Sequence, residues 1–145
     1  MSMSVARILA SKGKAVHTIA PHRTLLEAAR SLGEKRIGAL VVTGADGQVL
    51  GILSERDIAR ALVAGAGALE DAVSKHMTED VVMCRPSTSL HELMEQMTLG
   101  RFRHVPVLDG GGQLAGLVSI GDAVKLRLAE MEAESRAMRD YIATA

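Results

Sequence analysis

Hydrophobic and polar positions follow the same pattern twice along this chain, over residues 21–60 and again over 86–125. The two segments align without a gap at an offset of 65 positions (86 − 21), with 10 identical residues among 40. A tandem duplication predicts two similar units that pack on each other, and any site formed by one unit should occur twice. Because a unit of this size is only marginally stable alone, we expect the two units to share one core.

Each unit begins with a predicted strand and a predicted helix. β-favouring runs at 16–19 and 81–84 are each followed closely by a proline, which is typical of a strand that ends in a turn. Capping boxes at 24–27 and 89–92, with a hydroxyl residue three positions before Glu, predict where the helices start. Apolar side chains then recur at helical spacing and predict one buried face on each helix.

A hairpin and a second helix complete each unit. Apolar runs on either side of glycine-containing turns predict one hairpin over 39–53 and another over 105–118. Pro106 lacks a backbone donor, which predicts an edge strand or an unpaired register position. Ser54 and Ser119 each precede an Asp by three residues and predict the start of the second helices.

The connector and the C-terminal segment differ from the repeats. Residues 65–80 are rich in Gly and Ala, with a short helical piece predicted around 69–76. Residues 122–142 lack Gly and Pro and predict one long helix. Apolar positions along it recur at spacings of three and four, interrupted by Ser135. This helix could lie along its own module or contact a second copy in a homodimer, and the homodimer is the favoured interpretation.

Composition disfavours several classes of function. Charged residues number 17 basic and 17 acidic, so no net charge attracts nucleic acid or anionic lipid. Phe102 and Tyr141 are the only aromatic residues, so the chain lacks the aromatic side chains on which the bases of single-stranded nucleic acid stack. No apolar run approaches the roughly 20 residues of a membrane span. We therefore expect no nucleic-acid partner and no membrane partner.

Cysteine and histidine usage favours a cytoplasmic protein without a metal site. Cys84 is the only cysteine, so an internal disulfide is impossible, and the N-terminus lacks the pattern of a signal peptide. The histidines do not have the mutual spacing of metal ligands.

Four motifs give the chain a resemblance to a known family. Residues 36–42 and 101–107 match each other, as do 51–57 and 116–122, where Gly, two apolar residues and Ser precede Asp. This pattern resembles a tandem pair of CBS (cystathionine β-synthase) domains, the Bateman module, of the stand-alone bacterial type. The resemblance extends from about Val5 to Lys125.

The resemblance implies a fold of the α/β (α+β) class. Two β-α-β-β-α repeats would pack sheet to sheet about a pseudo-twofold axis, with a long C-terminal helix. It divides the chain into residues 1–68 (first repeat with an N-terminal helix), 69–125 (second repeat) and 126–145 (C-terminal helix).

The resemblance also implies two clefts for an adenosine-containing ligand such as AMP, ADP, ATP or NAD. Asp57 and Asp122 match the position that accepts hydrogen bonds from ribose hydroxyls. Phosphate suits a helix N-terminus, where Ser54, Ser119 and Arg56 add donors. The ligand-binding residues implied in this way are Thr18, Ile37, Ala39, Ser54, Arg56, Asp57, Val82, Arg103, His104, Pro106, Ser119, Ile120 and Asp122.

Differences between the repeats predict that the two clefts are unequal. The second repeat has Arg103 and His104 where the first has Gly38 and Ala39, and Arg56 has a glycine as its counterpart. Two basic side chains favour a ligand with more than one phosphate. The competing interpretations are that each Asp only caps its helix and that Arg103 and His104 are solvated surface residues.

Three functions follow from these residues. The favoured one is a regulatory module without catalysis, catalytic cofactor or metal, which binds a nucleotide and modulates an effector protein. The alternative is a dimerisation scaffold with unoccupied clefts. A hydrolase would need Cys84 or a serine as nucleophile, with a histidine such as His104 close by. A lone cysteine in a strand is more often a small buried hydrophobe, and no phosphate-loop motif occurs.

Overall fold

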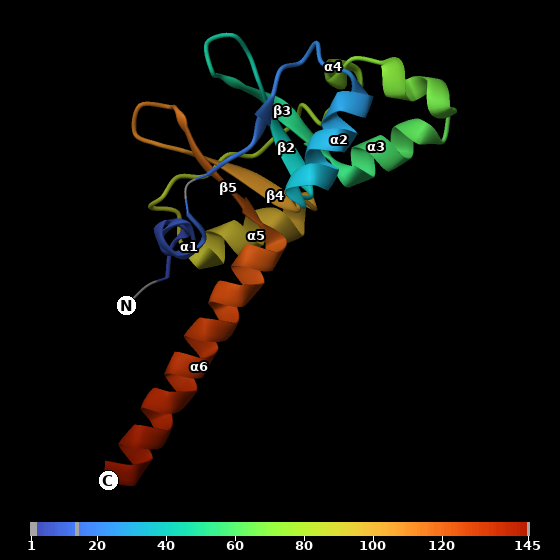
Figure 1. Ribbon diagram of the computed structural model, residues 1–145. Coiled ribbons are helices and arrows are strands. Elements are labelled where there is room, and N and C mark those ends of the chain that lie inside the picture. Colours follow the sequence, from blue (N-terminus) through green and yellow to red (C-terminus); the bar gives the residue numbers. More distant parts are fainter. Residues whose placement is uncertain (1–2, 14, 145) are drawn as a thin grey trace.

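The computed structural model describes residues 3–13 and 15–144. Figure 1 shows a compact body of two small sheets and short helices, from which one long helix leads away. The elements in chain order are α1 (Val5–Lys12), β1 (Thr18–Ile19), α2 (Leu25–Lys35), β2 (Ala39–Thr43), β3 (Val49–Ser54), α3 (Glu55–Leu62), the 3-10 helix η1 (Ala66–Glu70), α4 (Val73–His76), α5 (Leu90–Gly100), β4 (His104–Leu108), β5 (Leu114–Ser119) and α6 (Ile120–Thr144).

The two hairpins share the same backbone details. Both registers shift at equivalent places, between Val42 and Thr43 in β2 and between Val107 and Leu108 in β4. The turn glycines, Gly47 and Gly112, both have positive φ, at 83° and 80°. Equivalent helices, α2 and α5, both end at an arginine in the left-handed conformation. The duplication predicted from the sequence therefore extends to individual turns and bulges.

The first strand is the element in which the two sheets differ. In the first repeat β1 runs parallel to β2, and β3 completes the sheet. In the second repeat the predicted strand at 81–84 is reduced to one bridge between Cys84 and Val107, so that prediction is wrong for 81–83.

Pro106 explains the loss of this strand. In the first repeat the Val41 N–H donates to the His17 carbonyl at 3.1 Å. The equivalent donor in the second repeat would be the N–H of residue 106, which proline lacks. The ladder therefore ends at Cys84, and Pro106 lies on a strand whose only partner strand among the described residues is β5, which agrees with the predicted edge strand.

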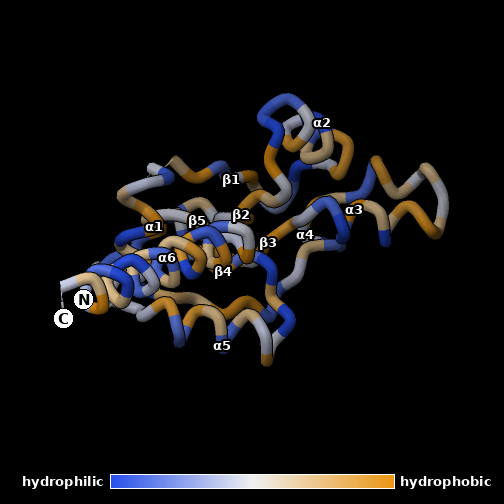
Figure 2. The backbone as a smooth tube through the Cα atoms, turned by 90° about the horizontal axis from the view of Figure 1, so that it is seen from below, coloured by the Kyte–Doolittle hydropathy of each residue, from blue (hydrophilic) through white to orange (hydrophobic). Residues whose placement is uncertain are grey.

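Two hydrophobic clusters, one for each repeat, form most of the interior, so the part of the core that the repeats share is limited to the residues buried between the sheets. One cluster contains Leu25, Leu40 and Leu53 of the first repeat, and the other contains Leu93 and Val118 of the second. In Figure 2, α2 and α5 lie on opposite sides of the strands, each outside its own sheet.

Each cluster is completed by a segment from the other half of the chain. Helix α1, which precedes the first repeat in sequence, inserts Val5 and Leu9 into the cluster of the second repeat. Val73 of α4, from the connector, is buried in the cluster of the first repeat. In space, therefore, the N-terminal helix belongs with the second repeat, although sequence order placed it with the first.

The inner faces of the sheets bury each other. Successive side chains of a strand point to opposite faces, so the face opposite Leu40 carries Ala39 and Val41, which are 4% and 0% exposed. On β4 the equivalent face carries Pro106, also fully buried. Because the helices cover only the outer faces, the second sheet covers these residues, as the sheet-to-sheet arrangement requires.

Helix α6 is the longest element, at 25 residues. Its start packs on the second repeat through Ala123 and Leu126, and every residue from 131 to 144 is exposed. Among the described helices, none combines the length and the apolar composition needed to cross a bilayer.

Two equivalent glycines allow close packing against β3 and β5. A Cβ added at Gly51 would lie 2.6 Å from the Thr78 carbonyl oxygen, and one added at Gly116 would lie 2.7 Å from Leu9 Cδ2. The carbonyl is fixed, because Thr78 and the strand residue Ile52 exchange two backbone hydrogen bonds of 2.8 and 3.0 Å. The Leu9 methyl is the end of a side chain, so it can shift.

We therefore predict that Gly51→Ala destabilises the fold more than Gly116→Ala. Overpacking typically costs about 1–3 kcal/mol, and we expect Gly51→Ala at or above the top of that range and Gly116→Ala near the bottom. Urea unfolding of the two variants beside the parent chain measures the difference. Equal losses, or a larger loss for Gly116→Ala, would show that the backbone contact at Thr78 is not the constraint.

Candidate functional site

A cavity of ≈ 480 Å³ opens where the start of α3 meets the segment before β4. Such a volume is within the range of small-molecule sites. Both repeats contribute to it. Its lining residues are Gly38, Ile52, Ser54, Glu55, Arg56, Asp57, Arg60, Thr78, Val81, Arg101, Phe102, Arg103 and His104.

Asp57 is the buried carboxylate of the cavity, with 6% of its surface exposed. Its Oδ2 accepts from the Ser54 N–H at 2.8 Å and the Ser54 hydroxyl at 3.1 Å, which forms the predicted cap of α3. Its Oδ1 accepts from the Thr78 hydroxyl at 3.3 Å, and Arg60 Nη1 lies 3.6 Å away. These last two contacts are long, so Oδ1 is the oxygen that a ligand hydroxyl could reach by replacing them.

Four arginines line the same cavity as this carboxylate. Arg56 and Arg60 are one turn apart on α3, which places them on the same helix face. Arg101 ends α5 with a φ of 57°, and Arg103 precedes β4. Against these four positive charges the lining has only Glu55 and Asp57, so the cavity is suited to an anionic ligand.

His104 lies between the two repeats at the start of β4. Its ring is 3.7 Å from the position that a Cβ on Gly38 would occupy, and its strand partner is Ser119. Burial, then the positive charges of Lys12 and Arg103, lower the pKa of His104 below its ordinary 6.5, although Asp122 and Glu55 oppose the shift. The imidazole is therefore neutral at pH 7 and can both donate and accept.

Five predicted ligand-binding residues meet in this cavity, from both repeats. Ser54, Arg56 and Asp57 come from the first repeat, and Arg103 and His104 from the second. The differences between the repeats had suggested Arg56 for one cleft and Arg103 with His104 for the other, whereas the structure brings all three to the same cavity. The reason is the pseudo-twofold packing, which brings the start of β4 beside Gly38.

The predicted ligand-binding residues on the strands and beside them lie outside the cavity lining, namely Thr18, Ile37, Ala39, Val82 and Pro106. Ala39 and Pro106 are buried between the sheets, and Thr18 is exposed on β1. Ile37 packs against the cluster of the first repeat. Val81 lines the cavity in place of the predicted Val82.

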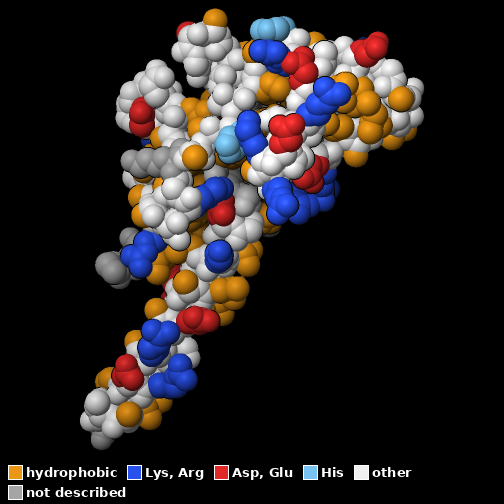
Figure 3. All heavy atoms as spheres, viewed as in Figure 1, with side chains coloured by type: hydrophobic (Ala, Val, Ile, Leu, Met, Phe, Trp, Pro, Cys, Tyr) orange, Lys and Arg blue, Asp and Glu red, His pale blue; other side chains and the backbone are white. Residues whose placement is uncertain are grey.

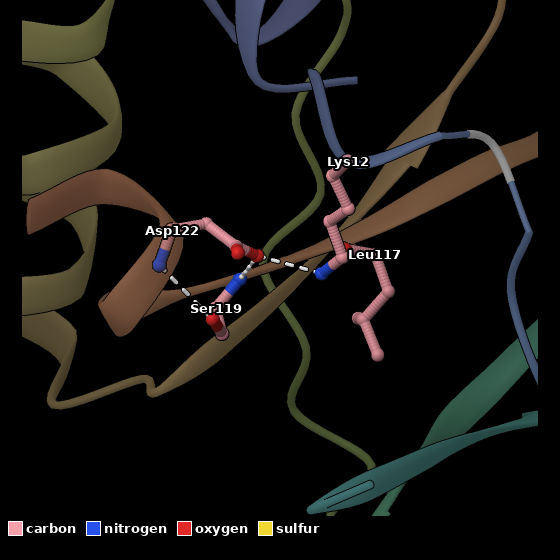
Figure 4. A network of polar contacts seen from close by, with 4 residues as sticks. All are labelled: Lys12, Leu117, Ser119 and Asp122. Carbon is pink, nitrogen blue, oxygen red and sulfur yellow. Dashed lines mark hydrogen bonds and ion pairs between the residues drawn. The ribbon is translucent and has the colours of Figure 1, made fainter. Parts of the chain in front are cut away.

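The remaining predicted residues, Ser119, Ile120 and Asp122, form the equivalent position of the second repeat. There the carboxylate is already engaged, as Figure 4 shows. Lys12 Nζ donates to Asp122 Oδ2 at 2.6 Å and to the Leu117 carbonyl at 2.7 Å, while the Ser119 N–H donates to the same carboxylate at 2.8 Å. Burial alone would raise the pKa of Asp122, but Lys12 and Ser119 hold it below 3.8. The ammonium of Lys12 is thus the charge partner of this carboxylate in the unliganded chain.

Four residues of these two positions were not predicted as site residues, namely Lys12, Thr78, Arg60 and Arg101. Extending the 65-residue offset towards the N-terminus would have aligned Lys12 with Met77 (12 + 65), the residue before Thr78. Both segments precede the first strand of their own repeat and contact the Asp of the other. Arg101 is one of the ten residues that are identical between the repeats, where it aligns with Arg36, and this identity could have pointed to it.

Catalytic chemistry finds little support in these residues. Burial raises the pKa of Cys84 to about 12, so the thiolate that a nucleophile requires is absent at neutral pH. Cys84 is also outside the cavity lining. In the described part of the chain, no group of three or more His, Cys, Asp or Glu residues is placed to hold a metal ion.

Comparison with known proteins gives one consistent family. The family model described as "CBS domain" matches residues 9–64 and again 71–129. A relative of 17.7 kDa from Acidianus ambivalens is 34% identical over 128 residues, which are 88% of this chain and 75% of that protein. CBSCBSPB5 from Arabidopsis thaliana is 36% identical, but the chain spans only 21% of its length.

Solved structures have the same fold. The CBS-domain containing protein ATU1752 from Agrobacterium tumefaciens superposes with a TM-score of 0.83 at 49% identity, over 88% of this chain and 95% of that one. CBSX2 in complex with AMP has a TM-score of 0.74 at 22% identity, over 89% and 98% of the chains. The CBS domain pair of MJ0100 with 5′-methylthioadenosine and S-adenosyl-L-methionine has a TM-score of 0.79 at 24% identity, over 90% and 99%. At 22% and 24% identity, the similarity of this chain to CBSX2 and MJ0100 shows a common fold and nothing more.

We predict that His104 makes the stability of the fold pH-dependent. The unfolded chain binds a proton at the ordinary pKa of 6.5, whereas the folded state binds it only at lower pH. The free energy of unfolding should therefore fall as the pH drops below about 6.5. In His104→Gln this part of the loss should be absent. His91, with a side chain that is 85% exposed, supplies the matched control His91→Gln. Urea unfolding at pH 7.5 and 5.5 measures both, and an unchanged pH dependence in His104→Gln would contradict the assignment.

Proposed function

Because this chain belongs to the CBS-domain family, as a tandem pair of CBS domains, we propose that it is a cytoplasmic regulatory module that binds an adenine nucleotide and modulates an effector protein without catalysis. The observation that carries the proposal is one cavity lined by a buried carboxylate, Asp57, and by four arginines from both repeats. Relatives in the same fold support the ligand class, since CBSX2 is in complex with AMP and MJ0100 with adenosyl compounds. We further propose that the chain acts as a homodimer.

The charges of the cavity favour nucleotides that carry phosphate. In the proposed pose the ribose hydroxyls donate to Asp57 Oδ1, displacing the long contacts from Thr78 and Arg60. Arg60 is then free to join Arg56 and the other arginines on the phosphates. S-adenosylmethionine carries a positive sulfonium, which four arginines would repel. AMP, ADP, ATP or NAD therefore fit this cavity better.

The second cleft is proposed to be closed in the unliganded chain. A ligand that approaches Asp122 must first displace Lys12, whose two hydrogen bonds and charge stabilise the carboxylate. At Asp57 the residue equivalent to Lys12 is Met77, and the contact from Arg60 is longer, at 3.6 Å against 2.6 Å for Lys12 and Asp122. The Asp57 cavity is thus the primary site.

A scaffold with empty clefts is the second candidate function, and one observation favours it. Both aspartates already cap their helices by reciprocal bonds with a serine, Ser54 for Asp57 and Ser119 for Asp122. Their carboxylates are therefore explained without any ligand. If AMP, ATP, NAD and S-adenosylmethionine all fail to raise the melting temperature, the scaffold is the better account.

We predict that Arg101→Ala weakens ATP binding and that Arg36→Ala does not. Both arginines end a helix in the left-handed conformation, so the two substitutions disturb the backbone alike. Only Arg101 lines the cavity. Loss of a charge-assisted hydrogen bond should weaken binding about tenfold or more, measured by isothermal titration calorimetry. Equal effects of the two variants would place the phosphates elsewhere.

We predict that Lys12→Met opens the second cleft. Methionine is the residue that the first repeat has at the equivalent position, Met77, so the substitution makes the two clefts more alike. Calorimetry with AMP should change from one to two binding equivalents per chain. Lys35→Met, at an exposed lysine on α2, is the control and should retain one equivalent. A single equivalent in Lys12→Met would show that Lys12 does not exclude the ligand.

A further inference from the structure

The C-terminal half of α6 is a helix without a covering surface. Residues 131–144 are all exposed, and Figures 1 and 3 show this part of the helix leading away from the body. It amounts to roughly 20 Å of helix at 1.5 Å per residue. A single helix of this length is marginally stable in water unless one of its faces is packed.

Five of the exposed apolar side chains of α6 lie on one seam. They recur in heptads, with Leu128, Ser135 and Ile142 at the a positions and Val124, Met131 and Met138 at the d positions. The five apolar members are between 44% and 65% exposed. In Figure 3 hydrophobic side chains lie along the length of this helix beside charged ones.

The seam does not face the chain's own body. Near its start α6 contacts the second repeat through Ala123 and Leu126. At about 100° of rotation per residue, the line through Val124, Met131 and Met138 lies roughly a quarter turn from that contact. A second helix can therefore reach the seam without displacing the body.

We propose that α6 pairs with α6 of a second copy as a parallel, in-register two-stranded coiled coil. The proposal rests on the homodimer of the proposed function and specifies its contact. Charges beside the seam support it, because in this arrangement each g residue faces the e residue five positions later in the other helix. Arg127 then faces Glu132 of the second copy, and Glu134 faces Arg139 of the second copy. With the twofold axis, four opposite-charge pairs form.

The antiparallel arrangement over the same stretch is disfavoured by the same charges. It would place Glu132 against Glu132 of the second copy and Lys125 against Arg139 of the second copy. It would also pair Ser135 with Met131, leaving the hydroxyl against an apolar side chain. In the parallel register Ser135 faces its own copy across the axis, where the two hydroxyls can bond to each other.

Within one chain, part of this charge set is already paired. Arg127 contacts Glu130 one turn away and lies 4.0 Å from Glu134. Glu132 and Arg139 make no ion pair with any described residue of their own chain. Dimerisation would supply their partners. Since the seam has few layers and a serine in its middle, we expect a reversible dimer that dissociates on dilution.

Two charge-swapped variants test the proposal. The first carries Arg127→Glu and Glu134→Arg, and the second carries Glu132→Arg and Arg139→Glu. Each retains the net charge of the chain but places like charges in all four pairs, so each alone should dimerise at least about tenfold more weakly. Mixed together, the two variants place opposite charges in every pair. Analytical ultracentrifugation should show a heterodimer, with helical content checked by circular dichroism.

The outcomes separate this contact from other dimer surfaces. If both variants dimerise like the parent chain, the coiled coil is overturned while a homodimer through the body remains. If the mixture stays monomeric, the parallel pairing is overturned. A parent chain that is monomeric at high micromolar concentration overturns both, and nucleotide affinity measured on the same samples tests the ligand site separately. Ser135→Leu should strengthen the dimer at least about tenfold, since leucine packs well in such a seam.

Discussion

The structure depends on burying both faces of two very small sheets. Each sheet has helices on its outer face and the other sheet on its inner face, so Ala39, Val41 and Pro106 are excluded from water only when the repeats are together. With Phe102 and Tyr141 as the only aromatic residues, short aliphatic side chains must fill this interface. Gly51 and Gly116, at the same place in the two repeats, allow close packing elsewhere, against the Thr78 carbonyl and the Leu9 side chain.

The candidate site is a product of the same packing. Because the repeats meet about a pseudo-twofold axis, the start of α3 from one faces the segment before β4 from the other. A ligand that touches Asp57 and Arg103 together contacts both repeats. Such a ligand stabilises the relative position of the repeats in which both sets of contacts can form. An effector protein that binds across the two repeats could detect that change in relative position.

Most helices and turns could be predicted from the sequence, whereas the contacts between the repeats could not. Capping at Thr24 and Ser54, the turns at Gly47 and Gly112, and the long last helix all depend on neighbours in the chain, and the structure confirms them. The strand at 81–83 failed because its pairing needs a donor that Pro106, more than 20 residues away, does not have. The joining of Arg56 with Arg103, and the contact of Lys12 with Asp122, arise from packing between repeats, which no local pattern encodes.

The exchange of α1 and α4 between the repeats bears on how the chain folds as it is synthesised. The first repeat obtains Val73 soon after its own strands, so its cluster can form early. Val5 and Leu9 are synthesised before both hairpins, yet they must wait for Val118 before their cluster exists. Contacts so distant in sequence form late and slowly. Helix α1 is therefore made well before it can dock, and its apolar face stays uncovered until the second hairpin is complete.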